Sequence, residues 1–108
     1  MNNKGVVKVS KDVILNIIGL AALDVEGVDS VDGFRHSMNK EDFIVNDNRG
    51  INMEMINKDL YINLGVVIKM NYEIPEVAEK IQNNISKEIN EMTGLNVKEI
   101  NIDIIDLV

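Results

Sequence analysis

The sequence predicts an α+β domain of two layers, in which two helices pack on one face of a mixed or antiparallel sheet. Residues 59–70 alternate apolar and polar side chains, which is typical of a strand with one covered face. Residues 77–92 instead carry a single apolar stripe at helical spacing. At 108 residues the chain suits one domain over residues 1–108, in the order strand, helix, long loop, strand, strand, helix, strand.

The N-terminal part predicts a strand followed by a helix. Residues 5–9, "GVVKV", are rich in β-branched side chains and indicate a short strand that ends at Ser10. Ser10 is a good helix N-cap, and Asp12 places a carboxylate in the first turn of a helix over 11–24. The expected core stripe of this helix consists of Val13, Ile14, Ile17, Ile18, Ala21, Ala22 and Val25.

A second patch on the same helix lies outside that stripe and contains Asn16, Gly19, Leu20 and Leu23. Either the domain itself covers the helix on more than one side, or this patch is a docking face for another subunit or partner. Glycine in a helix costs about 1 kcal/mol relative to alanine, and close approach of another backbone is one reason to tolerate it at Gly19. We expect the second alternative, partner binding.

The acidic stretch "VEGVDSVDG" at 25–33 resembles the raw material of a calcium loop. Its carboxylates do not keep the alternate spacing of such a loop, and no glutamate closes it. Val25, Val28 and Val31 recur at every third residue, which indicates a corner with the valines inward and the acids in water. We therefore expect no metal site, and backbone rather than ligand roles for Gly27 and Gly33.

Residues 33–50 form a long polar connection, in which a helical turn is expected near 40–44. Its isolated apolar residues, Phe34, Phe43 and Ile44, are the second candidate interaction surface if the leucines of the first helix belong to the core.

The second half of the chain predicts a hairpin, a helix and a last strand. Strands over 51–56 and 59–70 flank a turn at Asn57 and Lys58, and a helix runs from Pro75 to the cap at Gly94. A change of parity predicts a bulge near Lys98 and Glu99 in the last strand. The expected core residues are Leu60, Ile62, Leu64, Val66, Ile68 and Met70 in the hairpin, and Val77, Ala78, Ile81, Ile85, Ile89 and Met92 in the helix.

Charge and motifs argue against most classes of activity. The net charge of −7 disfavours nucleic acid and anionic lipid. The chain has no cysteine, His36 is its single histidine, and its seven glycines form no phosphate-binding motif. The longest apolar stretch, 13–23, is about half of the roughly 20 residues that a membrane span needs, and no signal peptide is recognisable. We expect no enzyme activity, no cofactor and no membrane span.

Three pieces of the sequence, "GVVKVSKDVILNIIGLAALDVEGV", "IPEVAEKIQ" and "MTGLNVKEINI", resemble the alkaline shock protein family, also called the envelope stress response family. The resemblance covers nearly the whole chain. It implies a non-enzymatic cytoplasmic protein that supports the cell envelope of Gram-positive type bacteria. Self-association, and attachment to the membrane through a partner that spans it, are also implied. Residues 33–50 depart from the family, whose members tend to carry a longer apolar segment there.

One alternative from another class is a KH-like, RNA-associated α+β module, since the strand and helix order is compatible with it. The missing GxxG motif and the acidic balance weigh against RNA. A salt-dependent shift with nonspecific RNA would favour this alternative.

Overall fold

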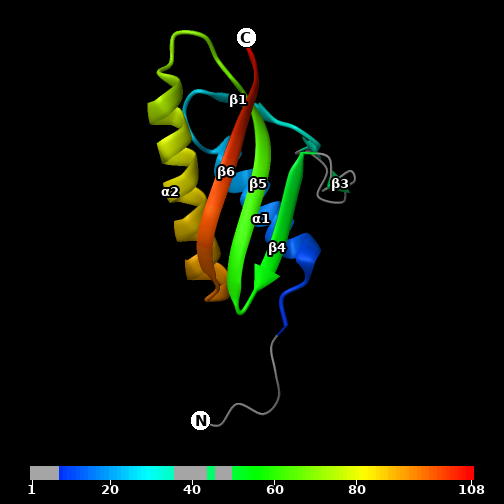
Figure 1. Cartoon of the computed structure of the whole chain (residues 1–108). Helices are drawn as coiled ribbons and strands as arrows, with labels where there is room; N and C mark the ends of the chain where they lie inside the picture. Colours follow the sequence, from blue (N-terminus) through cyan, green and yellow to red (C-terminus); the bar gives the residue numbers. More distant parts are fainter. Residues whose placement is uncertain (1–7, 36–43, 46–49) are drawn as a thin grey trace.

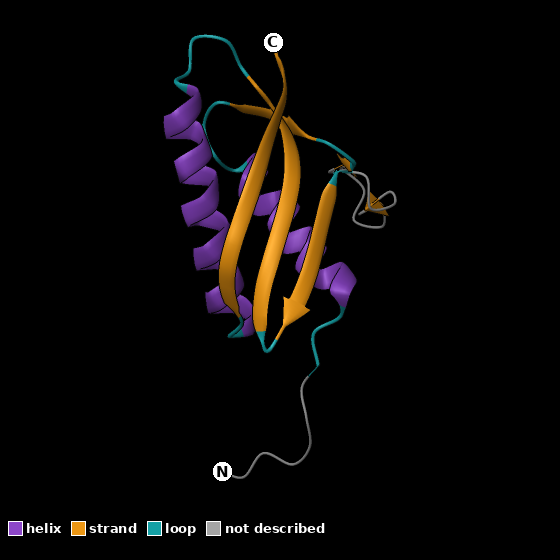
Figure 2. Cartoon of the chain, in the orientation of Figure 1, coloured by secondary structure: helices purple, strands orange, loops and turns teal. Residues whose placement is uncertain are grey.

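Two helices cover one face of a four-stranded sheet, and no helix or strand of the described residues covers the other face (Figures 1 and 2). The computed structural model describes residues 8–35, 44–45 and 50–108. The elements in chain order are α1 (Lys11–Leu23), β1 (Val28–Val31), β2 (Phe34–Arg35), β3 (Ile44–Val45), β4 (Ile51–Ile56), β5 (Asp59–Ile68), α2 (Ile74–Thr93) and β6 (Asn96–Leu107). The predicted two-layer α+β class, with both helices on one side, is confirmed.

Strand β5 is the centre of a mixed sheet. On one side it pairs in parallel with β6 along its whole length. On its other side it pairs antiparallel with β4 over 59–64 and with β1 over 66–68. Strands β1 and β4 thus form one interrupted edge, and β2 and β3 make a separate two-stranded ribbon.

Strands β1 and β4 are separated opposite Gly65 of β5, which hydrogen-bonds to Asp32 after β1 and to Gly50 before β4. The carbonyl of Gly65 accepts from the N–H of Asp32 at 2.9 Å, and the N–H of Gly65 donates to the carbonyl of Gly50 at 3.0 Å. A Cβ at Gly50 would overlap the carbonyl of Asp32, so glycine lets the two segments meet. The chain therefore leaves this edge after Asp32 and rejoins it at Gly50, and we call the residues between them the excursion.

The ends of both helices follow the predicted chemistry. The hydroxyl of Ser10 accepts from the N–H of Val13 at 3.2 Å and caps α1. Pro75 lies in the first turn of α2, and Gly94 ends that helix with a φ of 78°. The core between the layers contains Ile14, Ile18, Leu60, Ile62, Leu64, Val66, Ile68, Val77, Ile81, Ile85 and Ile89.

Three residues expected in the core are exposed instead. Val13 is 46 % exposed in the first turn of α1, Met70 is 60 % exposed beyond the end of β5, and Met92 is 65 % exposed in the last turn of α2. Each lies near or beyond the end of its element. Leu15, which was not expected inside, is buried because α1 is covered on more than one side.

The N-terminal strand is not observed in the described part. Lys8, Val9 and Ser10 belong to no strand, and residues 5–7 lie outside the described residues. The helical turn expected near 40–44 is wrong at Ile44, which begins β3, while residues 40–43 lie outside the described residues.

The acidic corner has the predicted arrangement. Val25, Val28 and Val31 are buried. Gly27 and Gly33 have positive φ angles of 99° and 72°. The corner is therefore built by glycine conformation and valine packing.

The turn and the bulge are also where the sequence places them. Asn57 and Lys58 both have positive φ, as a tight hairpin turn requires. The register of β6 on β5 shifts between Val97 and Glu99, which confirms the bulge at Lys98.

Candidate partner-docking groove

The predicted patch on α1 is divided between the core and the surface. Gly19 is buried, and a Cβ at this position would overlap the ring of Phe34, which is itself only 6 % exposed. The side chain of Phe34 in β2, and not another backbone, therefore explains the mid-helix glycine. Neither Gly19 nor Phe34 is available on the surface of this chain.

Leu20 is the exposed member of the patch, with 37 % of its surface accessible. Leu23 is half-buried and packs against the core. Asn16 is half-buried, and its side-chain oxygen is enclosed without a hydrogen-bond partner among the described residues. The two leucines thus do not form one exposed pair, and Leu20 alone faces outward.

The remaining candidates lie in the excursion. Phe43 and His36 are outside the described residues. Ile44 pairs with Arg35 in the small ribbon, through its backbone.

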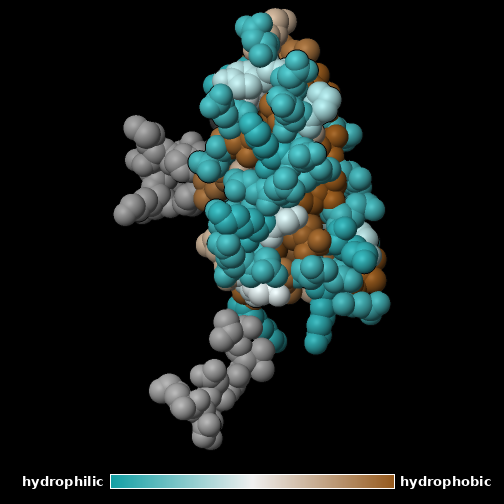
Figure 3. Space-filling view, turned by 90° about the vertical axis from the view of Figure 1, so that its left-hand side faces the viewer, coloured by the Kyte–Doolittle hydropathy of each residue, from teal (hydrophilic) through white to brown (hydrophobic). Residues whose placement is uncertain are grey.

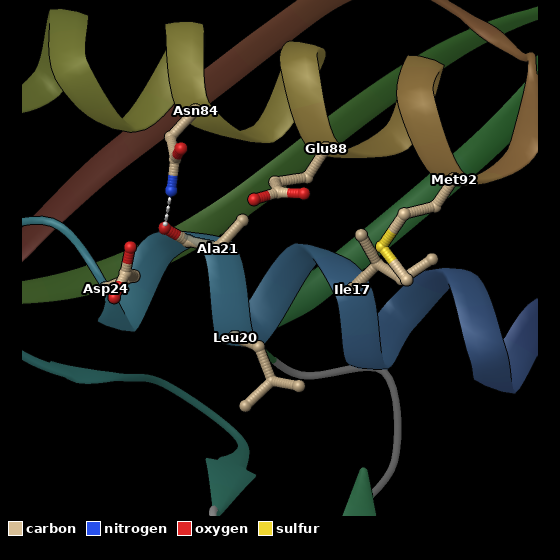
Figure 4. A pocket seen from close by; sticks show the side chains of 7 residues that line it. All are labelled: Ile17, Leu20, Ala21, Asp24, Asn84, Glu88 and Met92. Atoms are coloured by element: carbon tan, nitrogen blue, oxygen red, sulfur yellow. Dashed lines mark hydrogen bonds between the residues drawn. The ribbon is translucent and has the colours of Figure 1, made fainter.

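Leu20 borders a groove between the two helices (Figure 4). The groove has a volume of about 420 Å³ and is lined by Ile17, Leu20, Ala21, Asp24, Asn84, Glu88 and Met92. We call it the interhelical groove. Figure 4 shows Met92 of α2 beside Ile17 of α1, so the two helices together make an apolar end of the groove.

The other end of the groove is polar. The amide of Asn84 donates to the carbonyl of Ala21 at 2.7 Å and so joins α2 to α1. Glu88 and Asp24 add carboxylates on either side of this bond (Figure 4). A ligand of the groove would therefore meet aliphatic and thioether groups at one end and negative charge at the other.

A second depression of about 340 Å³ shares Asp24 and Asn84 with the interhelical groove and extends to Lys80, Lys87 and Glu26. Figure 3 views the molecule from the α2 side, where hydrophilic residues cover most of the surface and hydrophobic residues lie in gaps between them. The helix layer thus combines small apolar openings with charge of both signs.

The contribution of α2 to the groove was missed from the sequence. Met92 was expected in the core stripe, and no role was expected for Asn84 or Glu88. The spacing of Asn84, Glu88 and Met92, four residues apart, does place them on one line of the helix. Sequence alone contains no signal that this line faces α1.

One hydrogen bond fixes the corner beside the second depression. The hydroxyl of Tyr72 donates to a carboxylate oxygen of Glu26 at 3.2 Å. The negative charge of Glu26 raises the pKa of Tyr72, and desolvation and the hydrogen bond itself add smaller increases. The ring of Tyr72 also lies against Gly27, where a Cβ would come within 2.8 Å of it.

Within residues 8–35, 44–45 and 50–108, no three acidic or histidine side chains converge as they would around a metal ion. Neither α1 nor α2 combines the length and the apolar character that a bilayer crossing requires.

Comparison with known proteins gives one family. The model of the alkaline shock protein 23 family, described as having a cell envelope-related function, matches residues 1–108. YqhY of Bacillus subtilis (strain 168) is 32 % identical over 104 residues, which are 95 % of this chain and 77 % of that protein. YloU of the same strain is 27 % identical over 105 residues, or 91 % of this chain and 84 % of that protein.

A relative with a functional name is longer than this chain. A stress response regulator gls24 homolog of Streptococcus pyogenes is 31 % identical over 98 residues. The match covers 88 % of this chain but only 54 % of that protein.

Among solved structures, the fold is similar to that of MamM-CTD, with a TM-score of 0.61 and 14 % identity over 88 % of this chain and 96 % of that one. A copper form of a MamM CTD variant gives a TM-score of 0.62 and 14 % identity over 90 % of this chain and 98 % of that one. At this identity the likeness concerns the fold alone.

Proposed function

Since the chain belongs to the alkaline shock protein 23 family, we propose that it is a non-enzymatic protein of the cell envelope stress response that acts by docking. In this proposal it resides in the cytoplasm, associates with copies of itself, and binds a membrane-anchored partner. The interhelical groove around Leu20 is the docking surface.

The observation that carries the proposal is the exposure of apolar side chains from both helices at one place. Leu20 and Met92 are 37 % and 65 % exposed, although Ile17 and Ala21 next to them are buried. A partner that covers these side chains would gain binding free energy, because burial of apolar area is favourable at roughly 25 cal/mol per Å². Names of relatives support the context: the family description refers to the cell envelope, and the gls24 homolog is named a stress response regulator.

The RNA-associated alternative has less support. An RNA-binding groove needs basic residues, whereas the interhelical groove presents the carboxylates of Asp24 and Glu88. The chain also has no GxxG loop.

The test substitutes a charge at the groove and, as a control, at an equally aliphatic surface position. Leu20→Glu should leave the circular dichroism spectrum near native, weaken concentration-dependent sedimentation, and reduce partner capture from chemically cross-linked cells. Ile105→Glu is the matched control, since Ile105 is 50 % exposed on the opposite face of the sheet beside Gly65. If both variants behave alike, the groove is not the docking surface.

A further inference from the structure

The outer edge of β4 has backbone groups without a partner among the described residues. Hydrogen bonding to β5 alternates along β4, and Gly50 faces Gly65 as a hydrogen-bonded position. The alternation then directs the N–H and C=O groups of Ile51, Met53 and Met55 away from β5. No described strand pairs with them there.

This edge has few of the devices that usually protect a free edge, and Glu54 is its one charged residue. Its sequence, "INMEMI", contains no proline and no lysine, and the pairing of β4 with β5 has no bulge. Met55 and Ile56 at its end are 47 % and 46 % exposed. A weakly protected edge with apolar side chains is a template for another strand.

The opposite edge of the sheet is different. The side chain of Gln82 in α2 donates to the backbone carbonyl of Ile100 in β6 at 3.1 Å and so occupies part of that edge. Strand β6 also carries two register irregularities. Strand addition is therefore favoured at β4 over β6.

We propose that residues 5–9 of a second copy of this chain dock on the outer edge of β4 as an additional strand. The segment "GVVKV" is rich in valine, which is favourable in strands. Residues 1–11 contain Lys4, Lys8 and Lys11 and no acidic residue, whereas residues 12–108 contain the other eight basic residues and all eighteen acidic ones. Opposite charges thus attract the segment of one copy to the body of another.

The segment of the same copy does not fit this edge. Helix α1 begins near the lower end of β4 and runs behind the sheet, and β4 points downward (Figure 1). Because only Ser10 separates residues 5–9 from α1, a strand from the same copy must run parallel to β4 on its outer side. The connection through α1 to β1 is then a left-handed crossover, which is rare, about 2 % of such units.

The inference rests on the self-association included in the proposed function, but it assigns a surface distinct from the interhelical groove. Its test uses the absence of natural cysteines. A copy with Glu54→Cys, an exposed position of β4, is mixed under oxidising conditions with a copy carrying Val6→Cys or Val7→Cys. Two positions are needed because neighbouring strand residues face opposite sides of a sheet.

A disulfide-linked dimer should form with one of the two valine variants. The control, Asp103→Cys on β6, removes an exposed carboxylate as Glu54→Cys does, and should link several-fold less. Equal linking by Glu54→Cys and Asp103→Cys would overturn the inference. A double variant that closes a disulfide within one copy at high dilution would also overturn it.

A second measurement separates the two surfaces. Met53→Pro removes an N–H that points away from β5, so the bonds to β5 remain while an added strand is blocked. Sedimentation velocity should show weaker association for Met53→Pro than for the wild type, because one of the two surfaces is blocked. Association that is unchanged in Met53→Pro but is lost in Leu20→Glu would contradict the strand addition and leave the groove in place. Loss of association in Met53→Pro but not in Leu20→Glu would support the strand addition at β4 and contradict self-association through the groove.

Discussion

The two helices differ in how many of their sides the rest of the domain covers. Helix α2 has 20 residues, and its four buried residues, Val77, Ile81, Ile85 and Ile89, form one line. Helix α1 has 13 residues, of which seven are buried, namely Ile14, Leu15, Ile17, Ile18, Gly19, Ala21 and Ala22. The sheet, α2 and Phe34 all cover parts of α1, whereas α2 meets the rest of the domain along a single stripe.

Because of this difference, an exposed apolar residue has a different cause in each helix. Helix α2 is polar outside its stripe, and its one exposed large apolar side chain, Met92, lies in the last turn. Helix α1 is apolar on most sides, so Leu20 is left outside a domain that already covers its neighbours. In the proposed function, this exposed apolar surface is the one that a partner covers.

The largest difference in the free energy of unfolding is expected between two alanine substitutions, one in each helix. Ile85→Ala removes a side chain with no exposed surface and should lower the free energy of unfolding by about 2–5 kcal/mol. Leu20→Ala should cost under about 1 kcal/mol, because Leu20 borders solvent. Urea unfolding of both variants measures the two losses in the free energy of unfolding. Equal losses would mean that Leu20 belongs to the core.

Gly19→Ala tests the cover that Phe34 provides for α1. Helix propensity alone predicts a gain of about 1 kcal/mol. The overlap with the Phe34 ring predicts a net loss of about 1–3 kcal/mol instead. In a Phe34→Ala background the same substitution should no longer be unfavourable. A stabilised single variant would show that the ring moves aside freely.

Asn84→Ala tests the bond between the helices at the polar end of the groove. Loss of the hydrogen bond to the carbonyl of Ala21 should cost about 1 kcal/mol in thermal or urea unfolding. Asn83→Ala is the control, because Asn83 is exposed and makes no hydrogen bond among the described residues. Identical stabilities of the two variants would show that the bond contributes nothing.

The smallest effect concerns pH and the contact between Tyr72 and Glu26. The pKa of Tyr72 is raised in the folded protein, so its contribution to stability is fully present below the ordinary pKa of about 10 and is lost as pH rises through the folded value. Tyr72→Phe should remove that alkaline decline and lower the stability at neutral pH slightly, because the hydrogen bond to Glu26 is lost. Tyr61→Phe is the control, since no described carboxylate bonds its hydroxyl. A wild-type stability that does not fall relative to that of Tyr72→Phe as pH rises above 10 would contradict this assignment.

Local chemistry made much of the fold predictable. The stripe of α2, the alternation of β5, the bulge at Lys98 and the glycine corner all depend on residues close in sequence. Pairing partners are a different matter, because alternation identifies a strand without identifying its neighbour. The parallel pairing of β6 with β5 and the continuity of β1 with β4 are of this kind.

The candidate site was predictable only in part, for the same reason. Leu20 follows from the amphipathic pattern of α1, since it lies outside the main stripe. The burial of Gly19 depends on Phe34, which lies in β2, and the other wall of the groove comes from α2, more than 60 residues along the chain from Leu20. No periodicity within one helix reports such contacts.

The central claim is that the interhelical groove is the surface through which the protein docks, beginning with copies of itself. The most direct test is the methyl signal of each methionine in an NMR spectrum recorded over a range of protein concentrations. Met92 in the groove and Met70 outside it are 65 % and 60 % exposed, so they form a matched pair. We predict that the Met92 signal shifts or broadens as concentration rises while the Met70 signal stays constant. A Met92 signal that stays constant while the sedimentation coefficient increases would contradict the claim.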